Sequence, residues 1–451
     1  MPNTQTPASK TRFRFLRSRR FFVCAAIFSI TGIWLFCGGA AGLAVSQARA
    51  ALTQRDVDTA QDWLEIADWF HGRKAEIAFL KSRACRRTGD LEEARKWLDV
   101  ALALGTDRGT VQRERILMSA QVGRMRDAEP WLSELLFNPG DDGREICEAF
   151  VTGYFLNEES QKADDLFATW IADFPEDSYP WIFKGKIYYR LDRFSLAEES
   201  YREALKRDPE SSDALTGLGS VLLKQKRPED ALVQFRRCLK IHSDLNGPRV
   251  GAAKALIILG RSEEALTELN LVLASEPDHD EALLKRGKIH MAAGRHEEAV
   301  RDLKNLCRLR TGGFEHRYQL ALALRAAGRD KEASEHFEFA EKGKTALNWA
   351  EKTTSQYPAD TADLGVRTEV ARIYLTYGNP MTGLAQLSVI LNEAPDNRQA
   401  LEVLVAYYRE CSEFDVSFVR LADVYQARID SLPAQKDVSS NEETPAVPVV
   451  E

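Results

Sequence analysis

The sequence predicts an all-α fold in which helix pairs stack into a solenoid, preceded by one transmembrane helix. An alanine recurs every 34 residues through the middle of the chain, and a fixed period of this length is typical of repeat architectures. These alanines are Ala163, Ala197, Ala231, Ala265, Ala299 and Ala333. Glycines, prolines and large apolar residues keep the same period, and a long uncharged run lies near the N-terminus.

The N-terminal part of the chain predicts a membrane anchor. Residues 1–20 are basic and contain no acidic residue, and residues 21–45 form an uncharged, mostly apolar run. About 20 apolar residues suffice to span a bilayer, and flanking arginines stay on the cytoplasmic side. We therefore expect a single-pass protein of the cytoplasmic (inner) membrane, with its repeats on the extracytoplasmic side. The alternative is a signal peptide cleaved near Ala48-Arg49-Ala50, but its apolar core would exceed the usual length of roughly 7–15 residues.

The repeats are expected to begin directly after this anchor. Residues 53–74 match the second helix of the following unit, and therefore predict an orphan half-repeat without its first helix. Residues 75–347 follow as about eight helix pairs. The early units are degenerate, because Lys81 and Arg115 occupy positions where apolar residues are expected.

Each period is predicted to be one pair of helices. Trp181, Gly185 and Tyr188 have helical spacing, and Ala197 and Tyr201 resume that spacing after a break. In several units a Gly-Arg dipeptide ends the first helix, since glycine readily adopts the left-handed conformation just past a helix end. Acidic residues open the second helix, where they interact favourably with the helix dipole. A proline closes many of the units.

This pattern resembles that of the tetratricopeptide repeat (TPR) family. The unit at 178–211 carries the family residues Trp181, Gly185, Tyr188, Ala197, Tyr201, Ala204 and Pro209. It departs from the family at Lys184, where leucine is usual. The resemblance implies a right-handed α-solenoid that serves as a scaffold for binding other proteins, and it does not identify the ligand.

The period is interrupted after residue 347. Residues 348–363 are predicted to be an insertion, formed by an extended helix and a turn at Tyr357-Pro358. Residues 364–431 resume the pattern as two further units that end the solenoid. Residues 432–451 contain prolines and few large apolar residues, and we expect a disordered tail.

The sequence contains no pattern of a catalytic or metal-binding site, so we predict no enzymatic activity, no metal and no cofactor. The cysteines lack C-x-x-C spacing, and those in the repeats are expected to be buried small side chains, with an intermolecular thiol as the alternative. His296-Glu297-Glu298 lacks the second histidine of a zinc protease, since Val300 stands in its place. The net charge of −7 argues against a nucleic-acid partner. No small-molecule substrate is expected either.

The TPR resemblance implies that the first helix of each unit lines a concave groove. Basic and aromatic residues at the outward positions of these helices make the groove the candidate partner-binding site. They are Tyr179, Lys186, Tyr189, Arg190, Lys224, Lys254, Lys288, Tyr318, Arg325 and Arg372. Such a groove suits an acidic extended segment of a partner protein, and the alternative is an ordinary solvated helix face.

We therefore predict a membrane-tethered TPR scaffold or adaptor that binds other proteins through its concave groove. The alternative function is that of a non-catalytic regulatory subunit in an envelope glycan- or secretion-handling enzyme complex, with catalysis supplied by another chain.

Overall fold

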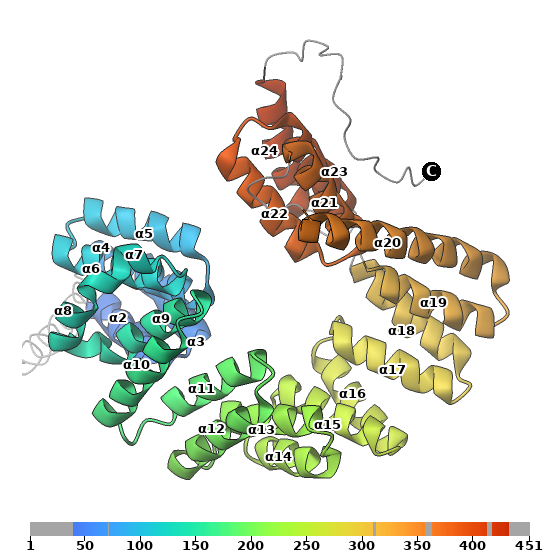
Figure 1. Ribbon diagram of the computed structural model, residues 1–451, viewed down its shortest axis with the longest axis horizontal. Helices are drawn as coiled ribbons and strands as arrows, with labels where there is room; N and C mark the ends of the chain where they lie inside the picture. Colours follow the sequence, from blue (N-terminus) through green and yellow to red (C-terminus); the bar gives the residue numbers. More distant parts are fainter. Residues whose placement is uncertain (1–38, 71, 310–312, 357–362, 413–416, 433–451) are drawn as a thin grey trace, which may run out of the picture. The chain divides into compact units, whose positions relative to one another are not determined.

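The computed structural model describes residues 39–70, 72–309, 313–356, 363–412 and 417–432. All the regular structure in these ranges is helical, and they contain no β-strand (Figure 1). The helices alternate as first and second members of pairs joined by short turns. The predicted all-α class is confirmed, and the right-handed sense of the solenoid stays a prediction.

The helix pairs follow the 34-residue period. The first helices are α2 (Gly39–Thr53), α4 (Lys74–Thr88), α6 (Arg108–Gln121), α9 (Gly143–Leu156), α11 (Tyr179–Arg190), α13 (Ser212–Lys224), α15 (Asn246–Ile258), α17 (Asp280–Ala292), α19 (Phe314–Ala326), α21 (Leu364–Tyr377) and α23 (Arg398–Cys411). The second helices are α3 (Val57–Trp69), α5 (Leu91–Ala103), α10 (Ser160–Asp173), α12 (Phe194–Arg207), α14 (Pro228–Ile241), α16 (Ser262–Ser275), α18 (His296–Leu309), α20 (Asp330–Gln356), α22 (Pro380–Glu393) and α24 (Ser417–Asp430). Contacts divide the chain into unit 1, residues 1–180, and unit 2, residues 181–451, which are described separately.

The second helix that follows α6 is broken into short pieces. These are α7 (Met125–Ala128), the 3₁₀ turn η1 (Glu129–Trp131) and α8 (Leu132–Phe137), and a second 3₁₀ turn, η2 (Gly140–Asp142), precedes α9. Pro130 lies at the break. Proline has no N–H to donate and its ring clashes with the preceding turn, so a continuous α-helix cannot form there.

The start of the described chain corrects the predicted membrane anchor. Residues 21–38 of the predicted span lie outside the described ranges, and residues 39–45 begin α2 instead. Ala41, Ala44 and Val45 are buried, and the last two pack in one core with α3 and α4. Within the described ranges, no helix combines the length and the apolar character needed to cross a bilayer. This finding contradicts the prediction of a single-pass inner-membrane protein with its repeats on the extracytoplasmic side.

Helix α2 also supplies the partner that the predicted orphan half-repeat lacked. Residues 53–74 contain α3, and α2 packs against α3 through buried alanines such as Ala48 and Ala51. The sequence of α2, GAAGLAVSQARAALT, consists largely of glycine and alanine. Such small residues let two helices approach closely, and they also prolong the uncharged run that precedes them. The apolar pattern alone could not distinguish a membrane-spanning helix from a closely packed first helix of a repeat.

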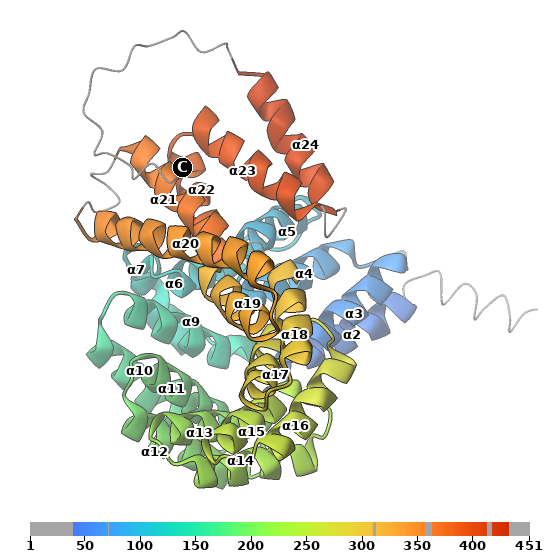
Figure 2. The same cartoon turned by 90° about the vertical axis from the view of Figure 1, so that its right-hand side faces the viewer.

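Close helix packing explains the periodic glycines of unit 2. Figure 2 shows α13, α14, α15 and α16 side by side, and their buried residues belong to one continuous core that runs from Ile182 to Ala333. The ring of Phe235 on α14 lies between Gly219 of α13 and Gly251 of α15. A Cβ atom on Gly251 would lie only 2.4 Å from that ring. Tyr201 is held in the same way one period earlier.

The predicted helix boundaries are confirmed in the central repeats. Gly260, Gly294 and Gly328 have φ angles of 73°, 72° and 77°, as expected of glycines that end a helix. Acidic pairs occupy the first turns of α16 and α18.

The predicted insertion continues an existing helix. α20 is 27 residues long and runs without a break from the second-helix position into the segment 348–356. The predicted turn at Tyr357-Pro358 lies outside the described residues, as do residues 1–20 and the predicted tail after Leu432. Beyond the gap, α21 to α24 complete two further pairs.

The contact between Gly251 and Phe235 predicts a position-specific effect of adding one methyl group. Gly251→Ala would push Phe235, which is fully buried, and we expect a loss of about 1–3 kcal/mol in the free energy of unfolding. Gly247, in the first turn of the same helix, has open space around its Cβ position. Gly247→Ala is the control and should be neutral or slightly stabilising in urea unfolding. Equal effects of the two substitutions would contradict this packing.

Candidate binding groove

The first helices of unit 2 line its inner face. α13 contacts α15 and α15 contacts α17, whereas successive second helices contact each other less extensively. A stack of helix pairs that is closer on one side curves toward that side. The concave surface expected from the sequence therefore belongs to the first helices, where the predicted groove residues lie.

Three lysines gather on this surface. Lys254 of α15 forms an ion pair with Glu281 of α17, with 2.8 Å between Nζ and Oε1. Lys285 and Lys288 lie one helical turn apart on α17. Burial lowers the pKa of Lys285, and the positive charges of Lys254 and Lys288 lower it further, against the opposing effect of Glu281. We name Lys254, Lys285 and Lys288 the lysine cluster.

Two members of this cluster, Lys254 and Lys288, were predicted because they recur at one position of successive repeats. Lys285 was not predicted, because it occupies a different position of the repeat. The signal available was its spacing of three residues from Lys288, since residues three apart lie on the same face of a helix.

The predicted ladder of lysines is partly neutralised by acidic residues. Lys186 of α11 lies 2.7 Å from Asp213 of α13, and Lys254 makes the equivalent contact with Glu281. In both pairs the acid comes 27 residues later, in the first turn of the next first helix. Exposed pairs of this kind contribute little to stability, so their lysines can exchange partners. Lys288 makes no ion pair with the described residues.

Tyr179 is committed to contacts inside unit 1. Its hydroxyl donates a hydrogen bond to Oε1 of Glu148 at 2.9 Å, and the guanidinium of Arg55 lies 3.3 Å from its ring centroid. Arg55 also pairs with Glu148. Within unit 1, Tyr179 therefore contacts α9 and the turn after α2, and its role in partner binding stays a prediction.

The other predicted aromatic residues pack on neighbouring helices. Tyr189 contacts the ring of Phe194 edge-on, with 5.9 Å between centroids. Tyr318 contacts Phe337 in the same manner at 5.6 Å, and Arg325 lies 4.9 Å from the centroid of the same ring. These side chains remain partly or fully exposed.

The remaining predicted residues are spread along the groove. Arg190 and Lys224 are exposed at the ends of α11 and α13. Arg372 on α21 pairs with Glu369 at 2.5 Å and borders a pocket of about 340 Å³ between α21 and α23. The structure thus places Lys254 and Lys288 near Lys285, and Tyr318 and Arg325 against the ring of Phe337.

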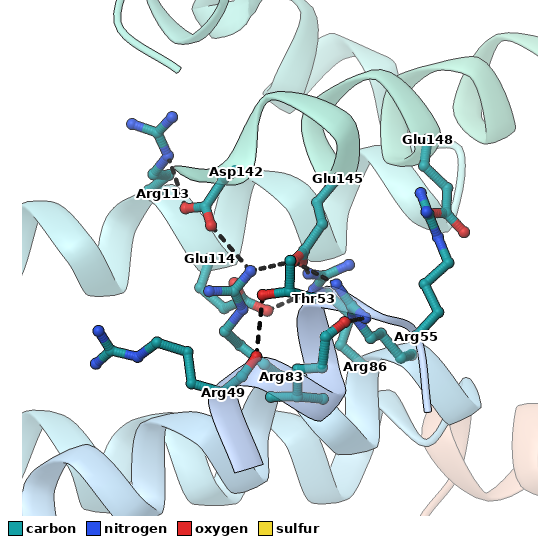
Figure 3. A network of polar contacts seen from close by, with 12 residues as sticks. Arg49, Thr53, Arg55, Arg83, Arg86, Arg113, Glu114, Asp142, Glu145 and Glu148 are labelled. Carbon is teal, nitrogen blue, oxygen red and sulfur yellow. Dashed lines mark hydrogen bonds and ion pairs between the residues drawn. The ribbon is translucent and has the colours of Figure 1, made fainter. Parts of the chain in front are cut away.

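In unit 1, buried ion pairs join the corresponding first helices (Figure 3). Arg86 of α4 pairs with Glu114 of α6 and, at 2.5 Å, with Glu145 of α9. The three side chains are 5%, 3% and 9% exposed. Arg83 and Arg87 of α4 also pair with Glu145. These five residues form what we name the arginine network.

The arginine network keeps its charges at neutral pH. Burial alone would raise the pKa of Glu145, but the guanidinium groups of Arg83, Arg86 and Arg87 outweigh it and lower the pKa to about 2. Burial would lower the pKa of Arg86, and the carboxylates of Glu114 and Glu145 outweigh that effect and raise it. The charges of the arginine network are therefore satisfied within the chain.

We predict that the arginine network stabilises unit 1. Glu145→Gln would leave the buried Arg86 and the partly buried Arg83 and Arg87 without their shared carboxylate, and breaking a buried pair costs about 3–5 kcal/mol. Hydrogen exchange should show α4, α6 and α9 losing protection while α15 and α17 keep theirs. Glu92→Gln, at a largely exposed carboxylate, is the control and should have little effect. Unchanged exchange in Glu145→Gln would contradict this role.

The lowered pKa of Glu145 also predicts how unit 1 responds to acid. Its pKa in the folded chain, about 2, lies below the ordinary value of 4.5. The stability that it contributes is therefore complete above about pH 4.5 and is lost as the pH falls toward 2. Thermal melts followed by circular dichroism should show this acid-dependent loss in the unaltered chain and a smaller loss in Glu145→Gln.

Comparison with known proteins identifies tetratricopeptide repeats in this chain. Family models described as "Tetratricopeptide repeat" match residues 45–108 and 184–244, residues 222–289, and residues 281–309. The first match includes most of α2, in agreement with its place in a repeat. A search of curated proteins found no match.

Several solved structures are similar over part of the chain. PilW, described as a type IV pilus biogenesis factor, is 18% identical, with 48% of this chain and 93% of PilW covered and a TM-score of 0.39. MamA from Desulfovibrio magneticus RS-1 is 16% identical, with coverages of 37% and 94% and a TM-score of 0.35. YrrB, described as a TPR protein with an unusual peptide-binding site, is 20% identical, with coverages of 39% and 90% and a TM-score of 0.34. Likeness at this level does not indicate what this chain binds.

Proposed function

We propose that this chain is a TPR protein-interaction scaffold that holds an acidic, extended segment of a partner protein on the inner face of unit 2. The observation that carries the proposal is the lysine cluster, in which Glu281 pairs with Lys254 and its charge also acts on Lys285, while Lys288 has no ion pair within the described residues. The tetratricopeptide repeats support it in general terms, because such repeats bind other proteins.

The chemistry of the lysine cluster suits carboxylates on a flexible chain. An ammonium group is a compact charge on a long stem and can follow a carboxylate that moves. The paired lysines can exchange Asp213 or Glu281 for a carboxylate of the partner, while Lys288 offers an unpaired charge. Because Lys288 is exposed and Lys254 is partly exposed, the attraction would act mainly on the rate of association and would weaken as salt rises.

The alternative function, a non-catalytic subunit of a glycan- or secretion-handling enzyme complex, has no contact of its own in its favour. It stays a prediction.

Within the described ranges, no group of three or more His, Cys, Asp or Glu side chains is placed to hold a metal ion. Cys147, Cys238, Cys307 and Cys411 are buried, as expected of small core residues.

Charge removal in the groove tests the proposal. The probe is a fluorescently labelled poly-glutamate peptide, with poly-lysine as the specificity control. Because each exposed charge pair contributes about 0.2–1 kcal/mol, Lys254→Gln with Lys288→Gln should weaken poly-glutamate binding roughly three- to tenfold. Its salt dependence should become shallower, and the melting temperature should hardly change.

The second helices provide a matched control. Like Lys254 and Lys288, the cations Arg236 and Lys240 of α14 comprise one that is paired and one that is not. Arg236 lies 3.0 Å from Glu264, and Lys240 has no ion pair within the described residues. Arg236→Gln with Lys240→Gln should leave binding of poly-glutamate unchanged. Equal losses in both variants would show a general effect of charge, and no loss in the groove variant would refute the proposed surface.

A further inference from the structure

A second charged site lies outside the groove. A pocket of about 620 Å³ forms where α17 meets the second helices α16 and α18. Leu273 and Leu283 are its buried apolar residues. Its polar residues are Asn270, Arg286, Arg301, Asp302, Lys304, Asn305 and Arg308. Four of these are cations and one is an acid, in a chain whose net charge is −7.

The single acid of the pocket is already neutralised. Asp302 is 6% exposed, and Arg286 donates to both of its carboxylate oxygens, at 2.7 and 2.9 Å. The remaining nitrogen of that guanidinium donates to Oδ1 of Asn270 at 2.8 Å. This contact turns the amide of Asn270 so that its NH₂ group is left to donate. Arg286 is thus a positioning residue.

The other three cations share one face of α18. Arg301, Lys304 and Arg308 follow one another at intervals of three and four residues, which places them along a strip of about 10 Å. Lys304 lies 3.0 Å from Glu332 of α20. Neither Arg301 nor Arg308 makes an ion pair or a hydrogen bond with the described part of the chain. The pocket therefore presents two unpaired guanidinium groups on either side of an ammonium group.

The repeat period supplies an internal comparison. Arg236 and Lys240 of α14 stand exactly two periods before Lys304 and Arg308. Arg236 pairs with Glu264, 28 residues later, just as Lys304 pairs with Glu332. At the position of Arg301, however, α14 has Val233, which is exposed. α18 thus adds a third cation to an arrangement that α14 also has.

We propose that this pocket binds a phosphate monoester group carried by a partner protein, as on a phosphorylated serine or threonine. Such a group carries about 1.5 to 2 negative charges and three acceptor oxygens. It can accept from Arg301, Arg308 and Asn270 at the same time, whereas a carboxylate has two oxygens and one charge. Leu273 and Leu283 give the apolar part of the phosphorylated side chain a surface to pack on. The residues are distinct from the lysine cluster, so this inference does not rest on the groove.

The test measures binding of small phosphorylated probes to the full-length chain. The probes are a capped Ala-phosphoserine-Ala tripeptide, the same tripeptide with serine, the same with glutamate, and inorganic phosphate, followed by calorimetry and phosphorus NMR. The phosphorylated tripeptide should bind at least about tenfold more tightly than the glutamate tripeptide, and the serine tripeptide should not bind. Absence of binding by the phosphorylated tripeptide overturns the proposal.

Variants locate the binding and control for charge and folding. Lys304→Gln with Arg308→Gln, and separately Arg301→Gln, should weaken binding of the phosphorylated tripeptide by about tenfold or more. The matched control is the double variant Arg236→Gln with Lys240→Gln, two periods earlier. It keeps Arg301 and should leave binding unchanged. Circular dichroism checks that each variant is folded. Equal losses of binding in the Lys304/Arg308 variant and the Arg236/Lys240 variant overturn the site. Equal affinity for the glutamate tripeptide, or binding of inorganic phosphate alone, overturns the phosphorylated side chain as the ligand.

Discussion

The close approach of helices at glycine and alanine is the constraint on which the rest of this structure depends. Phe235 fits only because Gly219 and Gly251 have no side chain, and Ala231, Ala265 and Ala299, which recur on successive second helices, are fully buried. Because each junction repeats the same contact, successive helices keep the same spacing and rotation. Polar residues at a given repeat position therefore meet the same neighbours in each pair, which is why Lys186 and Lys254 both find an acid 27 residues later.

The sequence predicts the helix pairs well because their determinants are local or strictly periodic. A glycine that ends a helix, or an alanine at a helix crossing, can be recognised from its own place in the repeat, without knowledge of its neighbours in space. It predicts the charged sites less well, because those depend on residues brought together by the stack. The acids that pair with Lys186 and Lys254 lie nearly one period away, and Lys285 joins the cluster from a different repeat position. Helix α2, which is rich in small residues, could not be predicted because its sequence continues an apolar run.

Charged residues have opposite roles in the two units. In unit 1, arginines at first-helix positions are buried with carboxylates and hold α4, α6 and α9 together. In unit 2, the corresponding helices are held by an apolar core, and the ion pairs of Lys186 and Lys254 lie at or near the surface. A degenerate repeat sequence thus does not indicate loose packing. Lys81, which occupies an expected apolar position, lies 2.7 Å from Asp68 of α3 and 4.5 Å from the centroid of the Trp97 ring on α5.

Repetition also shows how the charge of one surface position can change from one repeat to another. The ion pair between Arg236 and Glu264 and the pair between Lys304 and Glu332 use the same positions, two periods apart. The backbone at both places is set by the same helix contacts, so a change at the surface costs little stability. Arg301 occupies the repeat position at which α14 has the exposed Val233. An arginine at this exposed position adds charge without disturbing the core. A solenoid can therefore vary its ligands from one repeat to the next while every repeat keeps the same fold.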